Sequence, residues 1–126
     1  MTYNAFFIAL LVGLGGFFGT LSRYGLTVLL QKWACFFPFG TLASNICGCF
    51  IVGVISALAD RGGIFSPATR LFLATGFCGG FTTMSSMVFE TTRFFHSGQY
   101  LHASAYILLS VILSFFSFLC GFALVR

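Results

Sequence analysis

The sequence predicts an all-α membrane protein with four transmembrane helices, and three observations lead to this prediction. Of the 126 residues, 59% are hydrophobic and only 6% are charged, whereas soluble domains have about 25% charged residues. The apolar residues form four runs, each close to or longer than the roughly 20 residues that a helix needs to cross a bilayer. The runs are also too long and too evenly apolar for the short alternating strands of a β-barrel.

The four runs predict one transmembrane domain over residues 1–126, with helices at about 5–30, 39–59, 69–95 and 103–125. Turn residues separate the runs: Pro38 ends the first connection, Gly62 and Gly63 lie in the second, and Gly98 lies in the third. We expect no cleaved leader, because the uncharged segment Met1–Asn4 leads directly into the first run. An even number of spans places both termini on the same side of the membrane.

The net charge of +4 does not indicate nucleic-acid binding, because the six basic residues are spread along the chain. Arg61, Arg70 and Arg126 lie on the side of the termini, and Arg23, Lys32 and Arg93 lie on the other, provided that Arg23 reaches its nearer interface. Orientation in a membrane follows the excess of Lys and Arg in cytoplasmic loops. This even division predicts insertion in both orientations and an antiparallel dual-topology homodimer. The alternative is that a weak bias, or Asp60, fixes a single orientation.

Small residues recur at four-residue spacing in the first two runs, which allows helices to approach closely. The pairs are Gly15 and Gly19, Ser44 and Gly48, and Cys49 and Gly53. They serve either a dimer interface or packing within the chain. The five cysteines contain no Cys-x-x-Cys motif and lie mostly within the spans, which favours packing over a metal or redox role.

Three strongly polar side chains fall inside the spans, where such groups are costly unless they have a partner or a function. They are Arg23, Asn45 and Glu90. Asn45 either forms an interhelical hydrogen bond or contacts a transported solute. Glu90 either pairs with Arg93 or Ser86 or has a functional role, and Arg23 alternatively lies at the membrane interface.

The third run contains a polar stripe and a predicted break. At about 100° per residue, one helix face carries a series of polar residues, namely Thr83, Ser86, Glu90 and Arg93, with Met84 and Met87 on a neighbouring stripe. The glycine pair Gly79–Gly80 predicts a break near Gly79–Thr82, because glycine weakens helices. Irregular backbone inside a membrane is tolerated only where it is buried in protein or lines a cavity. Free carbonyls at such a break are suitable ligands for a hard cation.

Three stretches resemble, in order and spacing, the signature stretches of the CrcB/Fluc fluoride channels. They are GLGGFFGTLSRY at Gly13–Tyr24, PFGTLASNICGCFIVG at Pro38–Gly53 and GFCGGFTTMSSMVFE at Gly76–Glu90. The resemblance covers nearly the whole chain. It implies a multi-pass protein of the bacterial inner membrane, assembled as a dual-topology homodimer with two pores. It further implies passive export of fluoride from the cytoplasm and no enzymatic activity.

The resemblance also implies roles for individual residues. It assigns the fluoride pore to Asn45, Thr83, Met84, Ser85, Ser86, Met87, Glu90 and Ser114. It assigns a structural sodium ion at the dimer interface to the backbone carbonyls of Gly79 and Thr82 from each subunit. Arg23 matches the arginine in the family's first helix, and Phe118 stands where a further hydroxyl is expected. The implied partners are fluoride, sodium, a second copy of the chain and the lipid bilayer.

Met84 and Met87 depart from the family's usual T-T-F-S-T-F motif, whose two phenylalanines present aromatic edges to the anion. The edge of a phenyl ring is its positive rim, whereas a thioether sulfur is a weak acceptor. Two outcomes follow from this departure: either Asn45 and the hydroxyls suffice to conduct fluoride, or the loss of the rings abolishes conduction.

Two other classes remain as alternatives. A proton-coupled transporter that resembles the small multidrug exporters would need a membrane-embedded glutamate early in the chain, and the first run contains no acid. A non-transporting assembly subunit is the other alternative.

Overall fold

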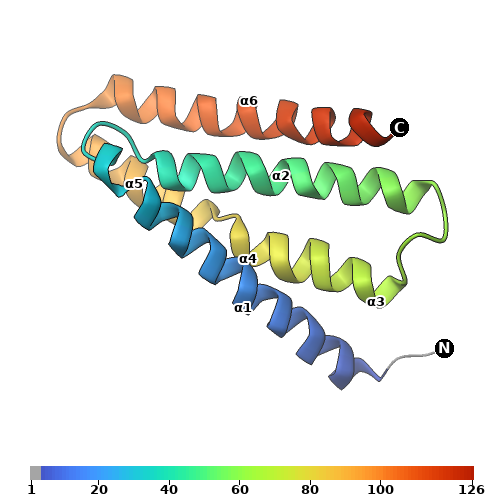
Figure 1. Cartoon of the computed structure of the whole chain (residues 1–126). Coiled ribbons are helices and arrows are strands. Elements are labelled where there is room, and N and C mark those ends of the chain that lie inside the picture. The colour runs from blue at the N-terminus through green and yellow to red at the C-terminus, as the bar shows by residue number, and fades with distance from the viewer. Residues whose placement is uncertain (1–3) are drawn as a thin grey trace.

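The computed structural model describes residues 4–126, which fold into helices joined by short connections (Figure 1). Within these residues, four helical spans are long and apolar enough to cross a membrane: Ala5–Leu29, Phe39–Asp60, Pro67–His96 and Tyr100–Val125. The prediction of four transmembrane helices is therefore confirmed. Successive spans run in opposite directions, so that the first span begins and the fourth span ends at the same end of the molecule (Figure 1).

Three of the spans are single helices, and the third is composite. The single helices are α1 (Ala5–Leu29), α2 (Phe39–Asp60) and α6 (Tyr100–Val125), with a short 3-10 turn, η1 (Gln31–Trp33), after α1. The third span consists of α3 (Pro67–Arg70), the π-helical segment η2 (Leu71–Cys78), α4 (Gly79–Phe81) and α5 (Met84–His96). α2 and α6 lie side by side and run in the same direction, while α1 packs against η2 (Figure 1).

The ends of these helices follow from local sequence. The Asn4 side chain accepts a hydrogen bond from the Phe6 N–H at 3.0 Å and caps α1. Ser66 caps α3, and Pro67 occupies the first helical position, where a missing N–H costs nothing. In the connection before α6, Gly98 adopts a φ of 73°, which glycine tolerates better than any other residue.

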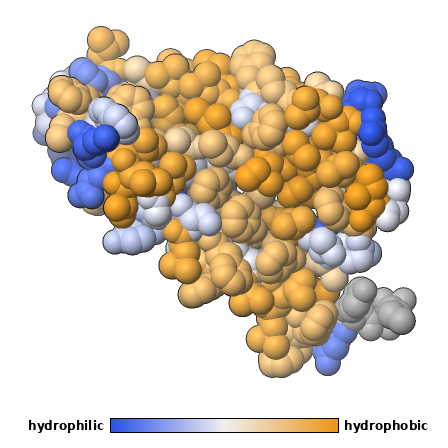
Figure 2. Space-filling view, in the orientation of Figure 1, coloured by the Kyte–Doolittle hydropathy of each residue, from blue (hydrophilic) through white to orange (hydrophobic). Residues whose placement is uncertain are grey.

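The surface is that of a membrane protein. Figure 2 shows apolar side chains over the middle of the molecule and hydrophilic side chains at two opposite ends. Large side chains such as Phe6 and Leu124 are 70% and 73% exposed, which in water would be an aggregation hazard. The chain is a multi-pass membrane protein, and lipid covers this surface.

Glycines allow α1 to lie directly against the first half of the third span. A Cβ added at Gly19 would lie 2.0 Å from the carbonyl oxygen of Phe77. A Cβ added at Gly80 would lie 2.4 Å from the carbonyl oxygen of Gly16. These backbones are therefore in contact at a spacing that no side chain larger than hydrogen permits.

The same arrangement joins α2 to α6. A Cβ at Gly53 would lie 2.2 Å from the Phe118 carbonyl oxygen, and one at Gly121 would lie 2.3 Å from the Phe50 carbonyl oxygen. The glycines that were predicted to form packing faces pack within the chain, namely Gly15, Gly19, Gly48 and Gly53. Of the two uses considered for them, packing within the chain is the one that the structure shows.

The third span is interrupted at Thr82 and Thr83, which have extended backbone with ψ of 157° and 119°. The break was predicted near Gly79–Thr82, and it lies at the C-terminal edge of that range. Gly79 and Gly80 themselves remain helical. The glycine pair thus does not unwind the helix, and Gly80 instead allows contact with α1.

Candidate functional site

The interruption is held open by Asn45 of α2. The Thr83 N–H donates to Asn45 Oδ1 at 2.7 Å, and Asn45 Nδ2 donates to the Thr83 carbonyl at 3.1 Å. The interhelical hydrogen bond considered for Asn45 is therefore present. Because an amide nitrogen carries two hydrogens, one Nδ2–H remains beyond the bond to Thr83.

The interruption also removes the usual donors from two carbonyls. In a continuous helix, the carbonyl of each residue accepts from the N–H four residues later. The Thr83 N–H instead donates to Asn45, which takes the helical donor from the Gly79 carbonyl. The Ser86 N–H donates to Thr83 Oγ1 at 3.2 Å and caps α5, which takes the helical donor from the Thr82 carbonyl.

Of the two carbonyls between Gly79 and Thr82, that of Gly80 is satisfied from α1. Arg23 Nε donates to the Gly80 carbonyl at 3.1 Å, and Thr20 Oγ1 approaches the same oxygen at 3.5 Å. The Arg23 side chain is half-buried and is directed at the break. Its Nε thus has a partner at the break, within the third span. The basic residues then divide three to two between the ends, with Arg61, Arg70 and Arg126 against Lys32 and Arg93.

A groove of about 460 Å³ lies beside the break, between α2, α5 and α6. We call it the central groove. Its lining includes six of the residues assigned above: Asn45, Thr82, Thr83, Met84, Met87 and Ser114. The other lining residues are Cys49 of α2 and Ser110, Val111, Phe115 and Phe118 of α6. The structure thus brings Asn45, Thr83 and Ser114 to one space.

Ser110 is the one buried side-chain oxygen in residues 4–126 that has no hydrogen-bond partner. It is 3% exposed and lines the central groove. A buried hydroxyl without a partner destabilises a fold by about 1–3 kcal/mol. Such a group marks a place where a ligand or water completes the hydrogen bonding.

The two methionines have different surroundings, although both line the central groove. Met87 is 8% exposed and packs with Leu42 and Tyr106 in the apolar core. Met84 is 72% exposed. The single chain therefore encloses only one of the two side chains that replace the aromatic edges.

Ser85 and Ser86 lie around Thr83 rather than in the groove lining. Ser85 Oγ is 3.1 Å from Thr83 Oγ1, and Thr83 Oγ1 is 3.2 Å from Ser86 Oγ. Ser85 is exposed and Ser86 is half-buried. The predicted polar stripe thus begins as a cluster of three hydroxyls at the start of α5.

Glu90 accepts hydrogen bonds from two other helices. Thr41 Oγ1 of α2 donates to Oε1 at 2.8 Å, and Tyr106 Oη of α6 donates to Oε2 at 2.6 Å. The pairing of Glu90 with Arg93 or Ser86 is therefore wrong, and no ion pair forms between Glu90 and Arg93 in the structure described. The carboxylate instead joins α2, α5 and α6.

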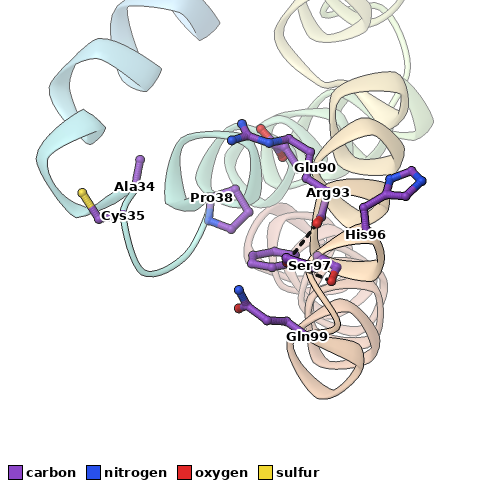
Figure 3. Close-up of a pocket in the computed structure, with 9 residues that line it drawn as sticks. Ala34, Cys35, Pro38, Glu90, Arg93, His96, Ser97 and Gln99 are labelled. Carbon is purple, nitrogen blue, oxygen red and sulfur yellow. Dashed lines mark hydrogen bonds between the residues drawn. The ribbon is translucent and has the colours of Figure 1, made fainter.

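Glu90 also borders a second cavity of about 590 Å³ at the polar end of the molecule, which we call the end cavity. Figure 3 shows Glu90 and Arg93 of α5 on one side of it and Ala34 and Pro38, before α2, on the other. Glu90 lies one helical turn beyond Met87, which lines the central groove. Glu90 and Met87 therefore lie between the two spaces.

Three residues of this region were not singled out from the sequence: Thr41, Tyr106 and Ser110. Tyr106, Ser110 and Ser114 follow one another at four-residue spacing on α6 and so share a helix face. That spacing was a signal for Tyr106 and Ser110. Thr41 had a comparable one, since it precedes Asn45 by four residues on α2.

Comparison with known proteins places these features in a family. Residues 10–122 match the family described as CrcB-like protein, Camphor Resistance (CrcB). A fluoride-specific ion channel FluC of Chlorobium phaeobacteroides is 50% identical over 112 residues, which is 89% of this chain and 87% of the relative. A channel of the same name from Leptospira interrogans is 43% identical over 108 residues, which is 82% of each chain. The chain therefore belongs to the CrcB family.

Proposed function

We propose that this protein is a passive, fluoride-selective ion channel of the cell inner membrane that lets fluoride leave the cytoplasm. The observation that carries the proposal is the central groove, where hydrogen-bond donors without protein partners lie among apolar side chains in the middle of a membrane span. The names of the CrcB relatives, which are fluoride-specific ion channels, support the choice of anion.

The donors of the groove are suited to a small, strongly hydrated anion. Narrow pores select ions by replacing hydration water with fixed polar groups. Asn45 retains one amide N–H, and the Ser110 hydroxyl has no partner in the protein. The Ser114 and Thr83 hydroxyls line the same groove. The amide N–H and the hydroxyls can each donate a hydrogen bond to an anion in this space.

Glu90 and Met87 lie between the groove and the end cavity, and Arg93 lines the end cavity. In this proposal, Arg93 attracts anions into the end cavity, because it is exposed there and Glu90 does not pair with it. Thr41 and Tyr106 hold both oxygens of the Glu90 carboxylate. The carboxylate is thereby fixed in position beside Met87, and fluoride passes it to reach the donors of the groove.

We propose that two copies assemble as an antiparallel dual-topology homodimer with two fluoride pores. One chain leaves the central groove open, since Met84 and Phe115, which line it, are 72% and 62% exposed. A second copy would close it. The bias of three basic residues to two is too small to impose one orientation strongly.

Dual topology is tested by adding three lysines to the loop at 61–66 or to the turn at 97–99, each of which should force one orientation. Either variant alone should lose fluoride transport in cells, and the two expressed together should regain it. Normal transport by a single forced orientation would contradict the antiparallel dimer.

We further propose that a structural sodium ion lies on the two-fold axis, held by the carbonyls of Gly79 and Thr82 from each subunit. Both carbonyls have lost their helical donors, as described above. Carbonyl oxygens at breaks in transmembrane helices bind sodium well. When bound, the ion supplies positive charge that joins the two breaks.

The decisive experiment is ion release from liposomes that contain the purified protein. We expect fluoride efflux down its gradient, no comparable chloride efflux, and no dependence on a proton gradient. Efflux that requires a proton gradient would instead indicate a coupled transporter, and an absence of efflux would indicate a non-transporting subunit. Empty liposomes serve as the control.

A further inference from the structure

Arg23 has a role that the anion pathway does not explain. Arg23 is a basic residue inside a span, and its side chain is directed toward the break in the third span. Its Nε–H donates to the Gly80 carbonyl at 3.1 Å. Thr20, one turn earlier on α1, approaches the same oxygen at 3.5 Å.

Three carbonyls of the break therefore need a donor or a cation from outside their own helix. The Gly79 and Thr82 carbonyls have lost their helical donors to Asn45 and Thr83. Gly80 would have been a third such carbonyl, because its helical donor, the Met84 N–H, lies beyond the interruption. Two donors from α1 use the two lone pairs of the Gly80 oxygen instead.

The position of Gly80 makes this arrangement rigid. A Cβ at Gly80 would lie 2.4 Å from the Gly16 carbonyl oxygen and 3.0 Å from Thr20 Oγ1. The Gly80 backbone thus rests on α1, which keeps its carbonyl within reach of the Arg23 and Thr20 donors. In contrast, Gly79 is exposed and an added Cβ there would meet nothing within 4 Å.

We propose that Arg23 is a positioning residue that determines which cation the break accepts. This inference rests on the sodium site proposed above. By occupying the Gly80 carbonyl, Arg23 removes it from the carbonyls of the break that are open to the ion. Its fixed positive charge also disfavours a second cation. Without Arg23, the additional carbonyls would enlarge the ligand set and accommodate a larger ion such as potassium.

The test measures dimer stability rather than fluoride flux. The thermal unfolding midpoint and the dimer fraction of the purified protein are followed during titration with sodium or potassium, in a background of N-methyl-D-glucamine. For the parent protein, we expect a lower half-saturating concentration for sodium than for potassium. Arg23→Met keeps an unbranched side chain but removes the charge and the donor. In this variant, the ratio of the half-saturating potassium concentration to the half-saturating sodium concentration should fall toward one.

Two further variants separate positioning from folding. Arg23→Gln keeps a donor for the Gly80 carbonyl and should retain most of the preference for sodium. Thr20→Val changes an exposed side chain and removes the weaker donor, so it should lower the ratio slightly, even if Arg23→Met does not fold. Arg70→Met, at an exposed arginine of α3, is the control for loss of one positive charge and should leave the ratio unchanged.

Several results would overturn the proposal. The first is a folded Arg23→Met dimer that keeps the parent's ratio. The second, if Arg23→Met does not fold, is a Thr20→Val protein that keeps the parent's ratio. The third is a parent dimer whose stability does not change with either cation. Fluoride efflux is measured separately on the same preparations. Failure of efflux with an intact preference for sodium would contradict the channel function alone. Efflux from a dimer whose stability does not depend on cations would contradict the sodium site, and with it the role of Arg23, but not the channel function.

Discussion

The two halves of the third span differ in composition and in the helices that they contact. Residues 67–81 are mainly apolar and lie against α1, where glycines bring the backbones together. Residues 84–96 contain hydroxyls, Glu90 and Arg93, and α5 lies against α6. The extended residues Thr82 and Thr83 separate the two halves.

This difference indicates a division of roles along one membrane span. The first half depends on shape, since its contacts with α1 leave no space for a side chain. The second half depends on hydrogen bonding, since its polar groups need partners inside a membrane. Changes in the first half should therefore alter folding, and changes around the second half should alter ion flux.

The largest effect is expected where the first half meets α1. Gly19→Val would place atoms within 2.0 Å of the Phe77 carbonyl oxygen and 2.9 Å of the Phe81 backbone nitrogen. Overpacking costs about 1–3 kcal/mol, and this change should lie at the upper end because the atoms that it meets belong to backbone. We expect loss of monodisperse protein and a strong fall in the thermal unfolding midpoint.

Gly13→Val is the matched control, because an added Cβ at Gly13 meets nothing within 4 Å. It should express and unfold like the parent. Equal stability of the two variants would show that α1 is not tightly packed on the first half of the span.

The next effect concerns Asn45, which touches the break from α2. Asn45→Asp keeps an acceptor for the Thr83 N–H but replaces the donor Nδ2 with a charged oxygen. Loss of a hydrogen bond to an ion costs about 1.5–3 kcal/mol, and the added charge repels fluoride further. We expect a folded dimer whose fluoride efflux falls to that of empty liposomes.

Asn45→Ala separates the two functions of this side chain. It leaves the Thr83 N–H without its partner, which should destabilise the protein by about 1–3 kcal/mol. The thermal unfolding midpoint should therefore fall in Asn45→Ala, which lacks both the acceptor for the Thr83 N–H and the donor toward the pore. Efflux from Asn45→Asp at the parent's rate would contradict the anion-donor role.

The fold and part of this site could be predicted from the sequence. Hydropathy alone was sufficient for the four spans, because a membrane requires long apolar helices. Asn45 and Glu90 could be recognised because polar groups inside a span are costly unless they have a partner or a function. The break was predicted to within a few residues from the glycine pair, although the glycines are helical and the hydroxyl residues after them are extended.

The partners of these residues could not be predicted in the same way. Helical periodicity identifies neighbours on one helix, such as Ser86 and Arg93 for Glu90. The actual donors to Glu90, Thr41 and Tyr106, come from two other helices. Arg23 is a similar case, since its bond to Gly80 depends on how closely glycines allow α1 to approach.

A substitution of Ser110 should reduce fluoride efflux less than a substitution of Asn45 does, and it should not lower stability. Its hydroxyl has no partner in the protein, so that Ser110→Ala removes a buried unsatisfied group. We expect unchanged or higher thermal stability and fluoride efflux lower by about tenfold, which corresponds to about 1.4 kcal/mol.

Ser117→Ala, on the same helix, should change stability and leave efflux unchanged, the reverse of Ser110→Ala. The Ser117 hydroxyl donates to the Ile46 carbonyl at 2.8 Å and does not line the central groove. Its loss should lower stability by about 1 kcal/mol and leave efflux unchanged. If both serines affect efflux equally, Ser110 has no special role in the pathway.

The smallest effect is expected from the methionines. Aromatic edges contribute about 1 kcal/mol each, so their absence should slow fluoride by less than about tenfold at each position. The parent protein should therefore conduct, and Met84→Phe with Met87→Phe should conduct somewhat faster. Efflux at the level of empty liposomes for the parent, restored by the two phenylalanines, would show that the rings are essential.

The two single variants sharpen the comparison further, because the methionines have different surroundings. Met87 is 8% exposed among Leu42 and Tyr106, so phenylalanine there must fit the existing core, and a swap of similar volume costs less than about 1.5 kcal/mol. Met84 is 72% exposed in the single chain, and phenylalanine there can alter efflux only if a second copy closes the groove around it. We therefore expect Met87→Phe to change both stability and efflux slightly, and Met84→Phe to change efflux alone. Chloride efflux is measured in parallel, since a rise in chloride flux in the parent relative to the phenylalanine variants would mean that these positions limit pore width rather than contact the anion.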